Sequence, residues 1–142
     1  MGELTGPLYD DVLVLSEEGS LLMEQKVYLK AVEVYRAALA KLPRPENQWE
    51  AYVWLKASIG DALYLLKDFK KASIEFFDAM NGPDGASNGF VLLRLGECLF
   101  EQGLPGASDY LCKAYLLEGE DIFSREEIKY LSVVKALLKK HD

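Results

Sequence analysis

One spacing of small and large residues occurs three times along this chain, and it constrains the fold more than any other feature. A glycine is followed by an alanine, then by a large residue four positions later, and by a second alanine three positions after that. Glycine and first alanine are twelve residues apart in two copies and eleven in the third. The copies are Gly19–Ala31–Tyr35–Ala38, Gly60–Ala72–Phe76–Ala79 and Gly96–Ala107–Leu111–Ala114. Such recurrence predicts a repeat protein.

The spacing within each copy is that of a helix. Residues three and four positions apart lie on the same face of a helix, so the large residue and its two alanines form one side of a second helix in each repeat. Glycine inside a helix costs about 1 kcal/mol relative to alanine and needs a packing reason. We expect the glycine of the first helix to face the first alanine of the second, which lets the two backbones approach closely. Proline follows the second helix at Pro43 and Pro83 and ends it.

Hydrophobic periodicity predicts helices only. Ser124 and Glu127 form a capping box that starts the last helix at residue 125. The apolar side of that helix is expected to cover the final repeat, because a solenoid otherwise exposes core at its end. The predicted helices span 8–24, 27–42, 46–66, 69–80, 88–102, 105–118 and 125–140, in one domain over 1–142 with repeats at 8–43, 46–82 and 88–119.

The repeated residues resemble the tetratricopeptide repeat family. Its pattern has a glycine or alanine, then alanine, an aromatic residue, alanine and proline at these offsets. The resemblance implies an all-α, tetratricopeptide-like solenoid of helical hairpins, with about three repeats and a C-terminal capping helix. The chain departs from the family in the shortened turn at 102–106 and at the early tryptophan position of each first helix, which holds Leu15, Lys56 and Leu92.

Composition narrows the partner class. The 142 residues are half hydrophobic, and 16 basic against 23 acidic residues give a net charge of −7. Such a surface repels phosphate backbones and anionic lipid, so we expect no nucleic acid and no membrane partner, and a basic protein surface is the natural complement. Residues 1–11 do not have the pattern of a signal peptide, and we expect a cytoplasmic protein. Cys98 and Cys112 are expected to be reduced.

The sequence predicts no enzyme. The single histidine, His141, is next to last, which leaves no nucleophile–base pair to build around it. Metal-ligand spacings of cysteine and histidine do not occur, and no glycine-rich phosphate loop follows a strand, so we expect no cofactor and no metal. The glycines within 81–89 predict a flexible loop, which is a possible second contact for a partner.

In the tetratricopeptide family the first helix of each pair lines the concave side. Aromatic residues with a few charges are typical of the core of an interface. Tyr64 and Phe90 suit either partner contact or packing between helices. Asp61 and Glu97 each follow a repeat glycine, so they are either two carboxylates that meet in the groove or ordinary exposed acids. The positions carried over as partner-binding are Ser20, Met23, Trp54, Asp61, Tyr64, Phe90, Arg94 and Glu97.

A second resemblance concerns function. Segments 49–52, 59–62, 90–103, 114–123 and 129–131 resemble short bacterial tetratricopeptide proteins encoded beside polymorphic toxin genes, the immunity proteins. This implies that the chain binds one toxin domain with a basic surface and blocks its active site. The alternative is a general adaptor, or a secretion chaperone that binds peptide segments. A regulatory piece of a longer enzyme is less favoured, because the chain has its own predicted cap.

Overall fold

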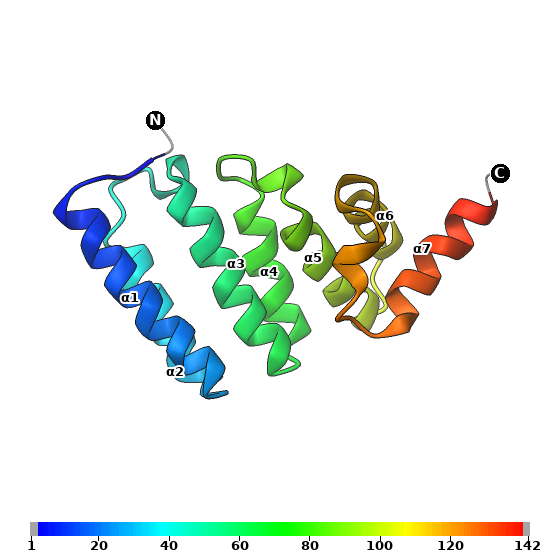
Figure 1. Ribbon diagram of the computed structural model, residues 1–142, viewed down its shortest axis with the longest axis horizontal. Coiled ribbons are helices and arrows are strands. Elements are labelled where there is room, and N and C mark those ends of the chain that lie inside the picture. The colour runs from blue at the N-terminus through cyan, green and yellow to red at the C-terminus, as the bar shows by residue number, and fades with distance from the viewer. Residues whose placement is uncertain (1–2, 141–142) are drawn as a thin grey trace.

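A computed structural model describes residues 3–140 of the chain, which leaves His141 outside the described residues. The helices follow one another along the long axis, so the first and last helices lie at opposite ends of the molecule (Figure 1). Within residues 3–140 there is no strand. The α-helices are α1 (Pro7–Glu24), α2 (Tyr28–Ala40), α3 (Glu50–Leu65), α4 (Phe69–Ala79), α5 (Gly89–Glu101), α6 (Ala107–Glu118) and α7 (Ile128–Lys140), with short 3₁₀ helices η1 (Glu46–Gln48), η2 (Gly85–Ser87) and η3 (Glu120–Phe123).

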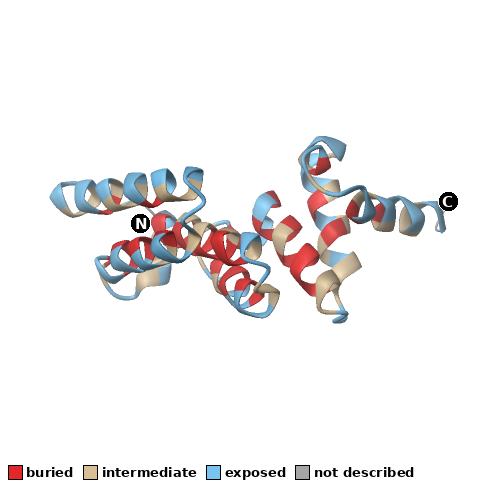
Figure 2. Cartoon of the chain, turned by 90° about the horizontal axis from the view of Figure 1, so that it is seen from below, coloured by how far each residue is buried: buried red, intermediate tan, exposed pale blue. Residues whose placement is uncertain are grey.

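Successive helices pack as hairpins, α1 with α2, α3 with α4 and α5 with α6. Neighbouring hairpins meet through α2 on α3 and α4 on α5, and α7 packs on α6. The predicted all-α architecture of helical hairpins is confirmed. Figure 2 shows the buried residues gathered where helices face one another. One apolar cluster extends from Val12 in α1 to Leu99 in α5, and a second from Leu92 in α5 to Val134 in α7. Helix α5 therefore connects the two parts of the core.

The nearest neighbour of each repeat glycine is the large residue of its repeat. A Cβ atom at Gly60 would lie 2.7 Å from Cζ of Phe76. The close approach expected at the glycine therefore includes the large side chain, which extends across the gap between the helices and occupies the space that a side chain at residue 60 would need. The other two repeats show the same relation: a Cβ atom at Gly19 would lie 2.5 Å from Cε1 of Tyr35, and one at Gly96 would lie 2.8 Å from Cγ of Leu111.

The three first helices end in the same turn. Lys26, Lys67 and Gly103 each have a left-handed backbone, with φ of 63°, 63° and 66°. In the second repeat the Lys67 N–H donates to the Tyr64 carbonyl and the next N–H donates to the Leu63 carbonyl. These two bonds define a Schellman motif, which satisfies the last carbonyls of a helix. The same pair of bonds occurs in the other two hairpins.

The third repeat differs after this turn. Helices α2 and α4 begin three residues before the first alanine of their repeats, whereas α6 begins at that alanine, Ala107. Gly106 precedes it with a φ of 94°. The connection between the two helices has five residues in the third repeat, 102–106, against three in each of the other two, so the expected shortened turn is wrong. The second helix lacks three residues at its start, and the predicted start at residue 105 is two residues early.

Two further predicted boundaries are wrong. The helix expected over 46–66 is divided into η1 and α3 by Trp49, which has an extended backbone at φ −102° and ψ 142°. Its indole Nε1 donates to the Pro43 carbonyl at 2.8 Å and holds the ring across this break. The capping box is not formed either, because Ser124 continues η3 with a helical backbone at φ −59° and ψ −27°, and α7 begins only at Ile128.

The glycines of residues 81–89 serve close packing. Gly85 is buried, and a Cβ atom there would lie 1.9 Å from the carbonyl oxygen of Ala79. Because glycine has no Cβ atom, the loop can pack directly against the end of α4. Both cysteines are free thiols; Cys98 is buried, whereas Cys112, which was also expected to be buried, is only partly so. Among residues 3–140, no helix has the length and apolar composition needed to cross a membrane.

Lys56 lies in an ion-pair network between three helices. Its Nζ lies 3.3 Å from Oε1 of Glu75 and 3.1 Å from Oδ2 of Asp78. Arg36 of α2 pairs with the same Glu75 at 3.1 Å. Helices α2, α3 and α4 are thus connected by polar contacts. Removing one member of such a buried ion pair lowers the free energy of unfolding, because the other charge is then left buried without a partner.

Candidate protein-binding surface

Helices α1, α3 and α5 contribute to one surface, which we call the first-helix face. On α3, Trp54, Ser58 and Asp61 are spaced by four and three residues and so lie on one side of the helix. Trp54 and Ser58 line a groove together with residues of α1. Asp61 bonds to Arg94 of α5. The fold therefore groups the predicted residues at two neighbouring places. One is the groove at Trp54, between α1 and α3, and the other is at Asp61, between α3 and α5.

A groove of about 580 Å³ lies between α1 and α3. It brings together two of the candidate residues, Ser20 and Trp54, with apolar side chains and carboxylates beside them. Met23, another candidate, does not line it and packs instead against the apolar core. The lining residues are Tyr9, Leu13, Ser16, Glu17, Ser20, Leu21, Glu24, Tyr35, Trp54 and Ser58.

A smaller hollow of about 220 Å³ adjoins this groove, because Tyr9 and Trp54 line both. We call the two hollows together the acidic trough. No lysine or arginine lines either part, whereas four exposed glutamates do. Within residues 3–140 none of these four forms an ion pair. They are Glu3, Glu17, Glu24 and Glu50; the smaller hollow is lined by Glu3, Leu4, Thr5, Gly6, Tyr9, Glu50, Ala51 and Trp54.

Arg94 organises the second place on the first-helix face. Its Nε donates to Oδ1 of Asp61 at 3.0 Å, and its Nη1 donates to Oε1 of Glu97 at 2.8 Å and also to Glu126. The Arg94 side chain is 12% exposed and that of Glu97 is fully buried. One guanidinium thus holds three carboxylates and connects α3, α5 and the segment before α7. We call these four residues the Arg94 cluster.

Two aromatic candidates cover this guanidinium. The Cζ of Arg94 lies 4.2 Å from the ring centre of Tyr64 and 5.2 Å from that of Phe90. Phe90 also meets Phe76 edge to face, with ring centres 6.2 Å apart, and remains 37% exposed. Packing between helices therefore accounts for one side of each ring. The part left exposed is available to a partner.

Glu97 does not present a free carboxylate. It is fully buried, and its Oε2 has no hydrogen-bond partner among the described residues. Burial, together with a hydrogen bond to Glu126 and the charge of that group, raises the pKa of Glu97 to about 8, while Arg94 acts in the opposite direction. Asp61 and Glu97 do meet, but as ligands of Arg94. Asp61 and Glu97 therefore do not form an acidic pair that is free to bind a partner. The exposed acidic side chains of the first-helix face lie in the acidic trough instead.

Sequence reasoning missed Glu126 and the trough glutamates. Glu126 lies in the segment where the sequence predicts the start of the last helix, and nothing in its neighbours indicates a partner 32 residues earlier. Glu3 and Glu50 come together through the path of residues 3–6 beside the start of α3. Only Glu17 and Glu24 had a local signal, since they share a side of α1 with Ser20.

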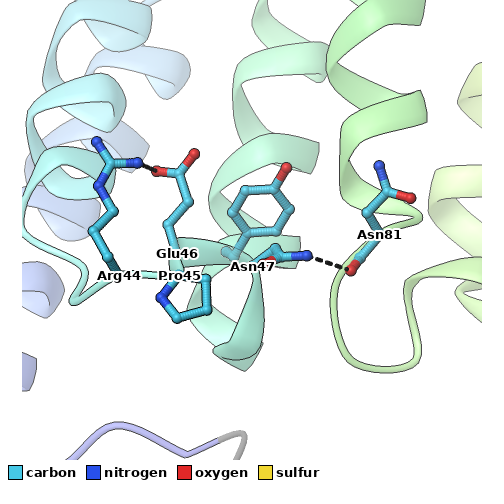
Figure 3. Close-up of a pocket in the computed structure, with 6 residues that line it drawn as sticks. Arg44, Pro45, Glu46, Asn47 and Asn81 are labelled. Carbon is cyan, nitrogen blue, oxygen red and sulfur yellow. Dashed lines mark hydrogen bonds and ion pairs between the residues drawn. The ribbon is translucent and has the colours of Figure 1, made fainter.

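Figure 3 shows a third hollow, of about 720 Å³, at the edge where two loops between repeats meet. Arg44 pairs with Glu46 at 3.8 Å, and Nδ2 of Asn47 donates to the Asn81 carbonyl at 3.2 Å. These polar groups largely bind one another, and only Tyr52 adds an aromatic ring. The hollow therefore offers a partner less apolar surface than the trough. Among residues 3–140, no three histidine, cysteine or acidic side chains are grouped so that they could hold a metal.

The chain matches no protein-family model and no curated protein. Among solved structures it is similar to the Yersinia enterocolitica type III secretion chaperone SycD in complex with a peptide of the translocator YopD. The TM-score is 0.71 at 15% sequence identity, over 94% of this chain and 96% of that one. The fold is tetratricopeptide-like. This similarity shows the helical-repeat fold, and it does not show the resemblance to toxin immunity proteins.

Proposed function

We propose that this chain is a chaperone or adaptor that binds a segment of a partner protein along the first-helix face. The observation that carries the proposal is the acidic trough, in which a partly exposed Trp54 lies between two adjoining hollows. Tryptophan is enriched among the residues that dominate binding energy at protein interfaces. A groove between helices accepts a peptide in extended or helical form. The similarity to SycD supports this choice, because that chaperone was solved with a peptide of its partner.

The immunity hypothesis uses the same surface differently. An immunity protein would cover the active site of a folded toxin domain, and the acidity of this chain would suit a basic toxin. We place it second, because the similar structure is that of a chaperone. The two hypotheses differ in what the partner is, a toxin that is neutralised or a protein that is kept competent for folding or secretion.

The test starts from capture of partners on the immobilised full chain from a lysate of its source. The reconstituted complex is then studied by hydrogen exchange, with protection expected on α1 and α3 and on one short segment of the partner. A partner that is toxic alone and loses its enzymatic activity on binding would instead establish the immunity hypothesis. Protection confined to α2, α4 and α6 would show that the first-helix face is not the binding surface.

A further inference from the structure

We infer that the acidic trough binds an extended partner segment in which lysine or arginine side chains flank an apolar side chain. This rests on the proposed function and names the chemistry of the segment that the site takes. It also assigns Glu17 and Glu24 as specificity-determining residues, although neither was among the candidates from the sequence.

Among residues 3–140, the glutamates of the trough have no ion-pair partner, unlike the carboxylates beside the trough. On the rest of the first-helix face, each carboxylate near the core has a cation of the same chain, as Asp61 has Arg94 and Glu101 has Lys129. The glutamates of the trough have none within residues 3–140, and no basic residue lines it. Unpaired carboxylates around a hollow attract cationic side chains and reject acidic ones. The complement of this surface is therefore basic.

The α1 side of the trough alternates apolar and acidic groups. Leu13, Glu17, Leu21 and Glu24 follow one another at intervals of four, four and three residues, so they form one row along the helix. Leu21 is 56% exposed in the free chain. A lysine or arginine can lay its aliphatic stem on leucine while its charged end reaches the next glutamate. Trp54 on the opposite wall provides a contact for an apolar side chain between two such cations.

The distance between the two glutamates of this row predicts the distance between the cationic residues of the bound segment. Glu17 and Glu24 are seven residues apart, which is about 10.5 Å along a helix axis. A polyproline II chain advances about 3.1 Å per residue and has three residues per turn, so residues i and i+3 lie on the same side of it, about 9.3 Å apart. The segment that fits has cationic residues at positions i and i+3 with an apolar residue between them.

A second copy of this chain is the occupant that competes most directly. Helix α7 carries four lysines and no acidic residue, Lys129, Lys135, Lys139 and Lys140. Two of them already pair within the chain, Lys129 with Glu101 and Lys135 with Glu120. We therefore favour a segment of another protein, and self-association is one outcome of the test.

The experiment selects peptides from a random phage-displayed library on the full chain. The same selection is made on Glu17→Gln/Glu24→Gln and on the matched variant Glu18→Gln/Glu33→Gln, which removes two exposed acids outside the trough. Peptides from the unchanged chain should be enriched in lysine or arginine three residues apart with an apolar residue between. A synthetic peptide with one of the selected sequences should bind the trough variant about tenfold more weakly than the unchanged chain, and should bind the matched variant as tightly as the unchanged chain. Its affinity should fall as salt is raised.

The outcomes separate the inference from the proposed function. Peptides that lack basic residues, or that bind the trough variant as well as the unchanged chain, would overturn the inference and leave segment binding intact. A library that yields no binder would count against both. Light scattering of the chain alone that shows a mass increasing with concentration, and lost in the trough variant, would make a second copy the occupant and overturn the inference.

Discussion

Gly60 lies against the ring of Phe76 so closely that a Cβ atom at residue 60 would be 2.7 to 2.9 Å from three ring carbons. Phe76 is itself fully buried, so its ring has little freedom to withdraw. Real Cβ atoms do not approach other atoms at such distances. The pairing of glycine with a large residue is therefore what joins the two helices of the hairpin, and it explains why the spacing recurs along the chain.

Gly60→Ala should lower the free energy of unfolding by about 1–3 kcal/mol, the usual cost of adding a methyl group to a packed core. The measurement is denaturant unfolding followed by circular dichroism. Phe76→Leu in the same chain should restore part of the loss, because leucine lacks the tip of the ring. A double-mutant cycle gives the coupling between the two sites. Strictly additive effects would show that the methyl group does not meet this ring.

Lys67→Gly should raise the free energy of unfolding by about 0.5–1 kcal/mol. The left-handed backbone at φ 63° costs a residue with a side chain about 1–2 kcal/mol, of which the greater chain entropy of unfolded glycine cancels a part. Gly103 already occupies the equivalent position of the third hairpin. Thermal and denaturant unfolding would measure the gain.

Lys41→Gly is the matched control for this change. Lys41 is also exposed and ends a helix, but its backbone is right-handed at φ −84°. Glycine there has no strain to relieve and should be destabilising. If the two glycine variants changed stability in the same direction, the left-handed turn would not be the cause.

The helical repeats could be predicted because their signal is local and periodic. Small and large residues at fixed offsets determine which sides of two adjacent helices can approach, whatever the rest of the chain does. The break at Trp49 and the late start of α7 could not be predicted in this way. Neither has a proline or glycine at the break, and both depend on tertiary contacts, such as the bond from the Trp49 indole to the Pro43 carbonyl.

The candidate site could be predicted less completely, because parts of it also depend on tertiary contacts. The offsets predict that Asp61 and Glu97 can lie near one another, and in the structure both accept hydrogen bonds from Arg94. The offsets do not predict that Glu126 is the fourth member of the Arg94 cluster. Its position depends on how the segment before α7 packs. The acidic trough depends likewise on where residues 3–6 lie against α3.

Glu97→Gln should remove a loss of stability that the unchanged chain shows as pH rises. The pKa of Glu97 is raised to about 8 in the folded chain, chiefly by burial, from 4.5. Between these values the folded state keeps a proton that the unfolded state loses, so the free energy of unfolding decreases with increasing pH and levels off above about 8. Glutamine is neutral throughout and should flatten the curve in that range.

Unfolding midpoints between acid and mildly alkaline pH would measure this effect. Glu101→Gln is an informative control, because hydrogen bonds from Lys129 and Tyr130 lower the pKa of Glu101. Its contribution is present above the ordinary glutamate pKa and is lost as pH falls through the lowered value. Glu101→Gln should therefore alter the acid limb, and Glu97→Gln the limb between 4.5 and 8. An unchanged profile for Glu97→Gln would mean that Glu97 is ionised in the folded chain.

Trp54→Ala should weaken binding of the partner segment by about 2 kcal/mol, roughly 30-fold, if Trp54 provides the main apolar contact of the trough. Trp49→Ala is the matched control, because Trp49 is also a partly buried tryptophan beside the core but lines neither hollow of the trough. Both variants lose packing and should unfold at lower denaturant concentration. Only Trp54→Ala should also lose affinity, measured by calorimetry at a temperature where both remain folded. Equal losses of affinity would attribute the effect to general destabilisation and remove Trp54 from the binding surface.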